Sequence, residues 1–228
     1  MTFSAIFIII KSESKSAILK NSKYKGGVGL KLEKLGKVNH GLTTSRIIAK
    51  PDELQEEIPL FTIQDLNIEM GNYDLKSEGK TISVSNQTFD KRLLSKENTV
   101  IVGLTVHKAY VIEKHHEGKI IPSNFAYIYL DESKIDPNYF MWYFNEHPNI
   151  KRQLQVATQG SMGIMALSVQ MLRELEIELP NIETQRRLGK IYKLRRTKEK
   201  VLYEKSILEK DLYKQLMINK LKEAMPCK

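Results

Sequence analysis

The amino-acid sequence predicts an α+β protein: a globular body built on a mostly antiparallel sheet, followed by one long C-terminal coiled-coil helix. Three observations carry this prediction. Short β-branched runs cluster in the middle of the chain, an aromatic stretch with helical spacing follows them, and the last third is nearly free of helix-breaking residues. Together they divide the 228 residues into a body over 1–180 and a helix over 181–228.

The predicted sheet comes from runs rich in β-branched and aromatic residues. The central ones span 98–104, 108–112 and 125–130. The first two are joined by a tight link and the third alternates like a half-buried strand, so we expect antiparallel neighbours. Residues 58–63 are also interpreted as a strand. The apolar run over 1–10 is too short to cross a bilayer and lacks the basic start of a signal peptide, so it is interpreted as a buried strand as well.

Asp136 and Pro137 predict the start of a helix, as its capping residue and its first residue. Large aromatic side chains recur behind them at helical spacing, which favours packing in the core over stacking on nucleic-acid bases. These aromatic residues are Tyr139, Phe140, Trp142, Tyr143 and Phe144. A second helical segment is expected over 149–158, ended by Gly160.

The segment from Asn181 onwards has no Gly after Gly189 and no Pro before Pro226. It is dense in residues that lose little on entering a helix. About forty helical residues would be roughly 60 Å long, which exceeds the body of a domain of this size. The apolar residues form a narrow stripe, which predicts a coiled-coil partner. This stripe, called the seam below, consists of Leu194, Val201, Leu208, Leu212 and Leu216.

The formal charge of +9 is unevenly distributed along the chain. Residues 1–50 hold ten basic side chains against two acidic ones, residues 181–228 hold fourteen against six, and residues 51–150 are acidic on balance. Two basic segments that flank an acidic one favour particular surfaces facing a polyanion, although basic charge alone also serves solubility. The single cysteine, Cys227, excludes an internal disulfide framework and favours a cytoplasmic location.

No set of residues has the sequence spacing of a catalytic or metal site, so we expect neither. The five histidines, including the adjacent His115 and His116, lack Cys or carboxylate companions at ligand spacing and are expected to be exposed. Asp52 and Glu132 superficially match the carboxylates of metal-dependent nucleases, but Glu132 falls in a predicted loop. A small nuclease that uses these two residues is one alternative function.

Several short blocks, taken in chain order, resemble the DNA specificity subunit of type I restriction-modification systems. The most specific block is 175–180, Leu-Glu-Ile-Glu-Leu-Pro. The others are 35–38 with Gly41, 58–60 with 65–66, 121–125, 135–140, 159–161, 167–168 with Leu172, and 184–185. The similarity covers roughly 30–221, enough for one target recognition domain and one helix, whereas family members usually carry two of each.

The resemblance implies a non-catalytic subunit that binds double-stranded DNA and reads one half of a two-part target. It also implies methyltransferase and restriction subunits as partners. Those partners would use S-adenosylmethionine, ATP and Mg²⁺, with no cofactor in this chain. A chain with one recognition domain should form a homodimer through its helix or pair with a second half-subunit. A coiled-coil adaptor without DNA contact is the other alternative.

By the family pattern, the loops after Gly41 and around Gly160 lie on the DNA side. Hydroxyl, amide and guanidinium side chains there suit contacts to base edges and phosphates. Lys151 and Arg152 are assigned to phosphates. The remaining expected DNA-binding residues are Thr43, Thr44, Ser45, Arg46, Gln159 and Ser161.

Overall fold

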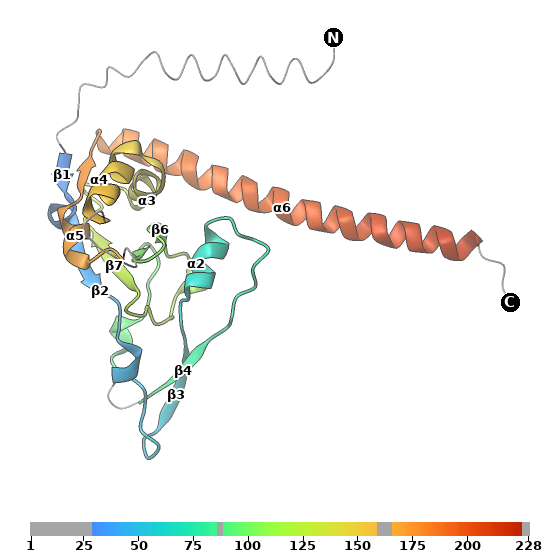
Figure 1. Ribbon diagram of the computed structural model, residues 1–228, viewed down its shortest axis with the longest axis horizontal. Helices are drawn as coiled ribbons and strands as arrows, with labels where there is room; N and C mark the ends of the chain where they lie inside the picture. The colour runs from blue at the N-terminus through green and yellow to red at the C-terminus, as the bar shows by residue number, and fades with distance from the viewer. Residues whose placement is uncertain (1–28, 86–88, 159–165, 225–228) are drawn as a thin grey trace, which may run out of the picture.

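The computed structural model describes residues 29–85, 89–158 and 166–224. The run over 1–10, Gly160 and Cys227 lie outside these residues. Figure 1 shows a body from which a single helix, α6, projects to one side. A two-stranded ribbon leaves the same body in another direction.

The central sheet has four strands in the order β2-β7-β5-β6, and every neighbouring pair is antiparallel. This arrangement confirms the prediction from the three central runs. Val100 pairs with Val111 on one side and with Ile128 on the other, so the buried side chains of three strands meet on one face. The strands are β2 (Gly36–His40), β5 (Val100–Gly103), β6 (Lys108–Val111) and β7 (Phe125–Leu130).

Two smaller ribbons complete the strand pairing. β1 (Gly29–Lys31) pairs with β8 (Glu176–Glu178), which brings the first described residues beside the segment that precedes the long helix. β3 (Gln55–Pro59) pairs with β4 (Thr81–Ser85), and this ribbon extends away from the sheet in Figure 1.

The expected strand over 58–63 is wrong in its second half. The chain leaves β3 at Pro59, and α2 (Ile63–Glu69) begins four residues later. The Thr62 hydroxyl accepts a hydrogen bond from the Asp65 backbone N–H at 3.0 Å, and the Asp65 carboxylate accepts one from the Thr62 N–H at 2.9 Å. This capping box satisfies two free N–H groups and therefore fixes a helix start inside a β-like sequence.

Helices α3 (Pro137–Glu146) and α4 (Pro148–Thr158) follow the sheet as predicted. The Asp136 carboxylate caps α3 by accepting from the Tyr139 N–H at 2.8 Å. The predicted aromatic face is confirmed as core: Trp142 is half-buried, and the fully buried members are Tyr139, Phe140, Tyr143 and Phe144. Shorter helical elements are η1 (Leu32–Lys34), η2 (Thr44–Arg46), η3 (Lys91–Leu93), η4 (Lys114–His116) and α5 (Val169–Glu174).

The long helix is confirmed as α6 (Ile182–Ala224), 43 residues in one element. Its first turns pack on α3, where Gly189 lies so close that an added Cβ would be 2.6 Å from Asp136 Oδ1. Gln185 is buried beside it and accepts from the Asp136 N–H at 3.0 Å. Among the described residues, no helix combines the length and apolar character needed to cross a membrane.

Candidate nucleic-acid interface

The predicted DNA-contacting residues Thr43 to Arg46 lie shortly after edge strand β2, as the η2 turn and the residue that precedes it. Thr43, Ser45 and Arg46 are exposed, and Thr44 is partly buried. The turn is tied to the body on both sides, because Leu42 bridges to Pro122 and Ile48 bridges to Val84 of β4. Its side chains are therefore presented from a fixed backbone.

Two surface hollows flank this turn. Thr44 lines a groove of about 610 Å³ and Arg46 lines a second one of about 390 Å³. The first groove is lined by apolar residues and by hydrogen-bonding ones, which include Thr62, Gln64, Asn67, Lys80 and Asn124. Ser85, Asp90 and Lys50 line the second. The amide, hydroxyl and basic groups suit contacts to base edges and phosphates. The carboxylates Glu53, Glu78 and Asp90 line the same grooves.

The outer face of β2 and β7 adds residues that the sequence did not single out. The register places Lys37 opposite Tyr129 and Asn39 opposite Tyr127, so all four side chains lie on one face. The two tyrosine rings are 5.5 Å apart and Tyr129 is 40% exposed. Partial burial, with a contribution from Tyr127, raises the pKa of Tyr129, so it stays a neutral hydroxyl. Strand alternation alone could have grouped the tyrosines, but not their β2 neighbours.

The structure does not bring all the predicted contact residues together. Lys151 and Arg152 are exposed on α4, at the end of the body next to the start of α6. The β3–β4 ribbon, to which the η2 region is bridged, extends from the opposite end in Figure 1. Gln159 and Ser161 lie outside the described residues. The η2 turn therefore lies apart from Lys151 and Arg152, which form a separate basic site.

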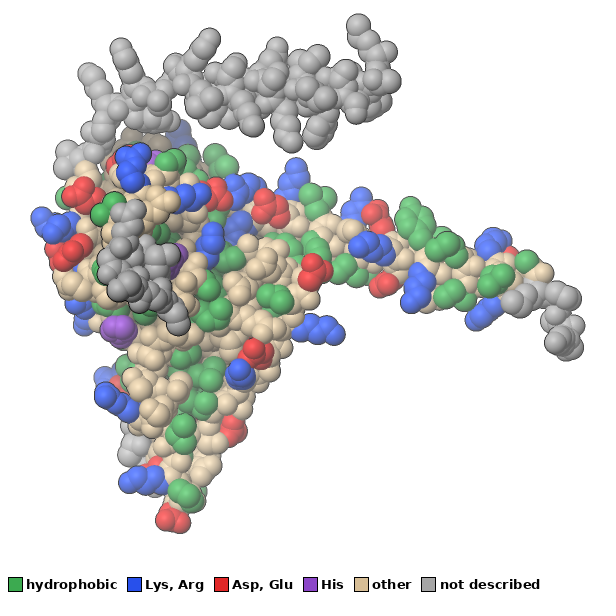
Figure 2. All heavy atoms as spheres, viewed as in Figure 1, with side chains coloured by type: hydrophobic (Ala, Val, Ile, Leu, Met, Phe, Trp, Pro, Cys, Tyr) green, Lys and Arg blue, Asp and Glu red, His purple; other side chains and the backbone are tan. Residues whose placement is uncertain are grey.

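The seam residues of α6 are all largely exposed, with accessible fractions of 58% for Leu194, 55% for Val201, 69% for Leu208, 56% for Leu212 and 49% for Leu216. From Glu204 to Ala224 every residue is exposed, a length of roughly 30 Å at 1.5 Å per residue. Figure 2 shows apolar side chains along this projecting part. Contiguous exposed apolar side chains of this kind are uncommon on monomeric soluble proteins.

A second apolar strip lies on the distal part of α6. Tyr213 is one residue, or about 100°, around the helix from Leu212. Met217 and Leu221 continue from it at intervals of four, and the three are 61%, 68% and 59% exposed. The distal helix thus offers apolar side chains on two sides, which the single predicted seam did not anticipate.

The base of α6 is held to the body by polar contacts from several elements. The Arg195 guanidinium pairs with the Glu146 carboxylate, and Arg196 donates to the Glu69 backbone carbonyl. Further out, the Tyr203 hydroxyl donates to Asp74 Oδ1 at 2.7 Å, and its ring lies 5.2 Å from Tyr73. These contacts fix the direction in which the exposed part of the helix leaves the body.

The expectation that all five histidines are exposed and lack carboxylate companions is wrong. His116 is 6% exposed, and both His115 and His116 contact Glu69 Oε1, at 3.0 and 3.2 Å between heavy atoms. Burial alone would raise the pKa of Glu69, but its hydrogen bonds with the two imidazoles lower it to about 2. Sequence spacing could not reveal the cluster, because Glu69 lies 46 residues before His115.

The two carboxylates of the nuclease alternative lie in different turns. Asp52 precedes β3, and Glu132 follows β7. Within the described ranges, the group of side chains that could share a metal ion is Glu69, His115 and His116, and it contains neither of these carboxylates. The geometry therefore lends the nuclease alternative no support.

Comparisons with known proteins place the fold and the family. The chain is similar to a chain from a study titled as the structural basis of assembly and conformational transition of the type I R-M system, with a TM-score of 0.56 and 16% identity over 89% of this chain. It is also similar to the HsdS subunit of Thermoanaerobacter tengcongensis, with a TM-score of 0.55 and 17% identity over 92% of this chain. This chain spans about half of each of those chains, 50% and 52%.

No curated protein sequence matched the chain. The family comparison matched residues 29–196 to the type I restriction modification DNA specificity domain. That match ends at Arg196, so it covers the whole described body and the first turns of α6. Because the match extends over most of the chain, the protein belongs to the family of type I restriction modification DNA specificity domains.

Proposed function

We propose that this chain is a half-specificity subunit, which reads one half of a two-part DNA target in a type I restriction-modification system. Family membership supports DNA specificity, and the chain has one recognition body where its structural relatives are about twice as long. The DNA-facing surface would combine the η2 turn with the outer face of β2 and β7. Arg46 and Lys37 would contact phosphates or guanine, and Asn39 would suit adenine.

The observation that carries this proposal is the seam. A helix that stands clear of its own body, with leucines 49–69% exposed, is poorly suited to a monomer. Pairing two such helices would place two recognition bodies at a fixed separation, as a two-part target requires. The partner would be a second copy of this chain or another half-subunit.

The second apolar strip, Tyr213, Met217 and Leu221, would then remain available on the outside of the paired helices. We assign it to the methyltransferase subunit, with the restriction subunit joining the resulting complex. S-adenosylmethionine, ATP and Mg²⁺ would be used by those partners, and this chain would direct them to DNA without catalysis of its own.

Selection of bound sequences from random double-stranded DNA tests the proposal. The full chain is expected to enrich two copies of one short sequence, inverted and separated by a constant gap. Affinity should fall steeply with salt, because bound phosphates release counterions. Failure to enrich any sequence at low salt would refute the proposal and favour the adaptor alternative. Mg²⁺-dependent cleavage by the purified chain would favour the nuclease alternative.

A further inference from the structure

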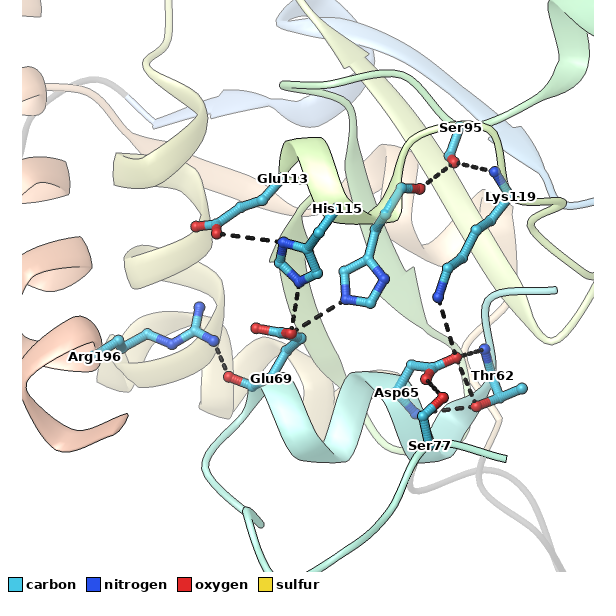
Figure 3. A network of polar contacts seen from close by, with 10 residues as sticks. Thr62, Asp65, Glu69, Ser77, Ser95, Glu113, His115, Lys119 and Arg196 are labelled. Atoms are coloured by element: carbon cyan, nitrogen blue, oxygen red, sulfur yellow. Dashed lines mark hydrogen bonds and ion pairs between the residues drawn. The ribbon is translucent and has the colours of Figure 1, made fainter. Parts of the chain in front are cut away.

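Three side chains from two elements converge beside the base of the long helix. Glu69 is the last residue of α2, and His115 and His116 end the η4 turn that follows β6. The Glu69 carboxylate and the two imidazole nitrogens offer three ligand atoms within 4.8 Å of one another. Figure 3 shows the carboxylate lying between the imidazoles and the α2 backbone.

The 3₁₀ turn η4 explains how two adjacent histidines can contact the same carboxylate oxygen. In a strand, neighbouring side chains point to opposite faces, which is why the sequence disfavours such a pair. In η4 the two rings instead lie side by side, with centroids 4.1 Å apart, and both turn their Nε2 atoms toward Glu69. The turn therefore builds a convergent donor set from consecutive residues.

We propose that Glu69, His115 and His116 form a binding site for a divalent transition-metal ion, with Zn²⁺ as the ion that the donors fit best. Two imidazoles and one carboxylate are a common zinc ligand set, with a fourth position open to water. Ligands about 2.0–2.1 Å from a tetrahedral zinc lie roughly 3.3 Å from each other. The separations of 3.0 and 3.2 Å between Glu69 Oε1 and the two Nε2 atoms are close to that edge length.

The surroundings leave the carboxylate free to act as a ligand. The Arg196 guanidinium donates to the backbone carbonyl of Glu69, not to its side chain (Figure 3). His115 Nδ1 lies 4.0 Å from Glu113 Oε2, too far for a hydrogen bond, so this carboxylate would have to move closer to orient the imidazole. His115 is about half exposed, which gives an ion a route from solvent.

A small cavity of about 80 Å³ adjoins the cluster and is lined by Glu69, Tyr110 and Arg196, among others. The Tyr110 hydroxyl is buried and has no hydrogen-bond partner in the described part of the chain. A cavity of this size has room for several water molecules.

A bound ion would join the end of α2 to η4. Its ligand Glu69 is also the residue whose backbone carbonyl accepts from Arg196 of α6. The ion would therefore stabilise the junction between the body and the helix. This inference is independent of the proposed function, because it concerns only the stability and metal content of the single chain.

Zinc competition with a chromophoric chelator tests the proposal, using the full chain purified without a histidine tag. The Cys227→Ser background removes the single thiol. We expect one Zn²⁺ per chain and a higher melting temperature with Zn²⁺. His115→Ala, at the most exposed ligand, should weaken binding by more than the roughly 10- to 100-fold that loss of an outer-shell partner costs. Glu69→Gln should do the same, and His40→Ala, on β2 outside the cluster, should bind as the parent does.

Circular dichroism of each variant separates lost binding from lost folding, and His115→Ala is the variant best placed to fold because its side chain is half exposed. Co²⁺ in place of Zn²⁺ should give a visible absorption band typical of a tetrahedral site, absent in His115→Ala. No stoichiometric binding by the parent chain, or equal binding by a folded His115→Ala, would overturn the proposal and identify the cluster as a hydrogen-bonded network only.

Discussion

Replacing two seam leucines by glutamine, Leu208→Gln with Leu212→Gln, should separate the paired helices while leaving each body folded. Both side chains project from the part of α6 that makes no contact with the body, and they are 69% and 56% exposed. Glutamine is about as good a helix former as leucine, so the helix itself should persist. The change therefore acts on the pairing surface alone.

The magnitude follows from the exposed area. Full burial of a leucine contributes about 1.5–3 kcal/mol, so the exposed half or more of each side chain represents roughly 1–2 kcal/mol. A homodimer would lose four such side chains, or about 4–8 kcal/mol, a weakening on the order of 10³- to 10⁶-fold. A dimer of micromolar affinity should then be monomeric at all practical concentrations.

Analytical ultracentrifugation over a concentration series measures the effect. The matched control is Lys210→Gln with Lys214→Gln, two changes on the side of the helix opposite Leu212, which should leave the dimer intact. A double leucine variant that sediments as the parent chain does, or a parent chain that is monomeric even when mixed with its cognate half-subunit, would refute the assignment of the seam.

Three further predictions concern the body. Gly189→Leu should lower the free energy of unfolding by about 1–3 kcal/mol through overpacking, since even a Cβ there would be 2.7 Å from the Tyr139 backbone nitrogen. Thermal unfolding should show a lower melting temperature for this variant and an unchanged one for the Lys190→Ala control. Arg46→Gln should weaken DNA binding and reduce the slope of log affinity against log salt by about 1, whereas Lys220→Gln on the distal helix should do neither; an unchanged slope would remove η2 from the interface. Burial alone would raise the pKa of Asp65, but hydrogen bonds from Ser77 and Thr62, with Lys119 nearby, lower it below 3.8. The stability from this charged carboxylate is therefore present above pH 3.8 and is lost as the pH falls through the lowered pKa. In that pH range the free energy of unfolding should fall less steeply with falling pH in Asp65→Asn than in an Asp211→Asn control.

The fold was largely predictable because its main elements have local signals. Alternation marks β7, the Asp136–Pro137 pair marks α3, and the absence of helix breakers marks α6. The error at Ile58–Ile63 also has a local cause: the Thr62–Asp65 capping box was present in the sequence, but the β-branched residues around it masked it.

The sites were less predictable because they depend on long-range pairing. The register of β2 against β7 decides that Lys37 and Asn39 share a face with two tyrosines, and no local pattern encodes that register. Glu69 meets His115 and His116 only after α2 packs beside η4. That the η2 turn and α4 lie at different ends of the body also had to come from the structure, whereas the sequence offered both segments as DNA-contacting candidates.

The most direct test of the account is a map of methylated bases in the genome of a host that carries the cognate methyltransferase subunit, with and without this chain. The account predicts that methylation appears only with the chain, at a two-part sequence with a constant gap, and that it is lost with Leu208→Gln and Leu212→Gln. An identical methylation pattern in the presence and absence of the chain would contradict its role as a specificity subunit.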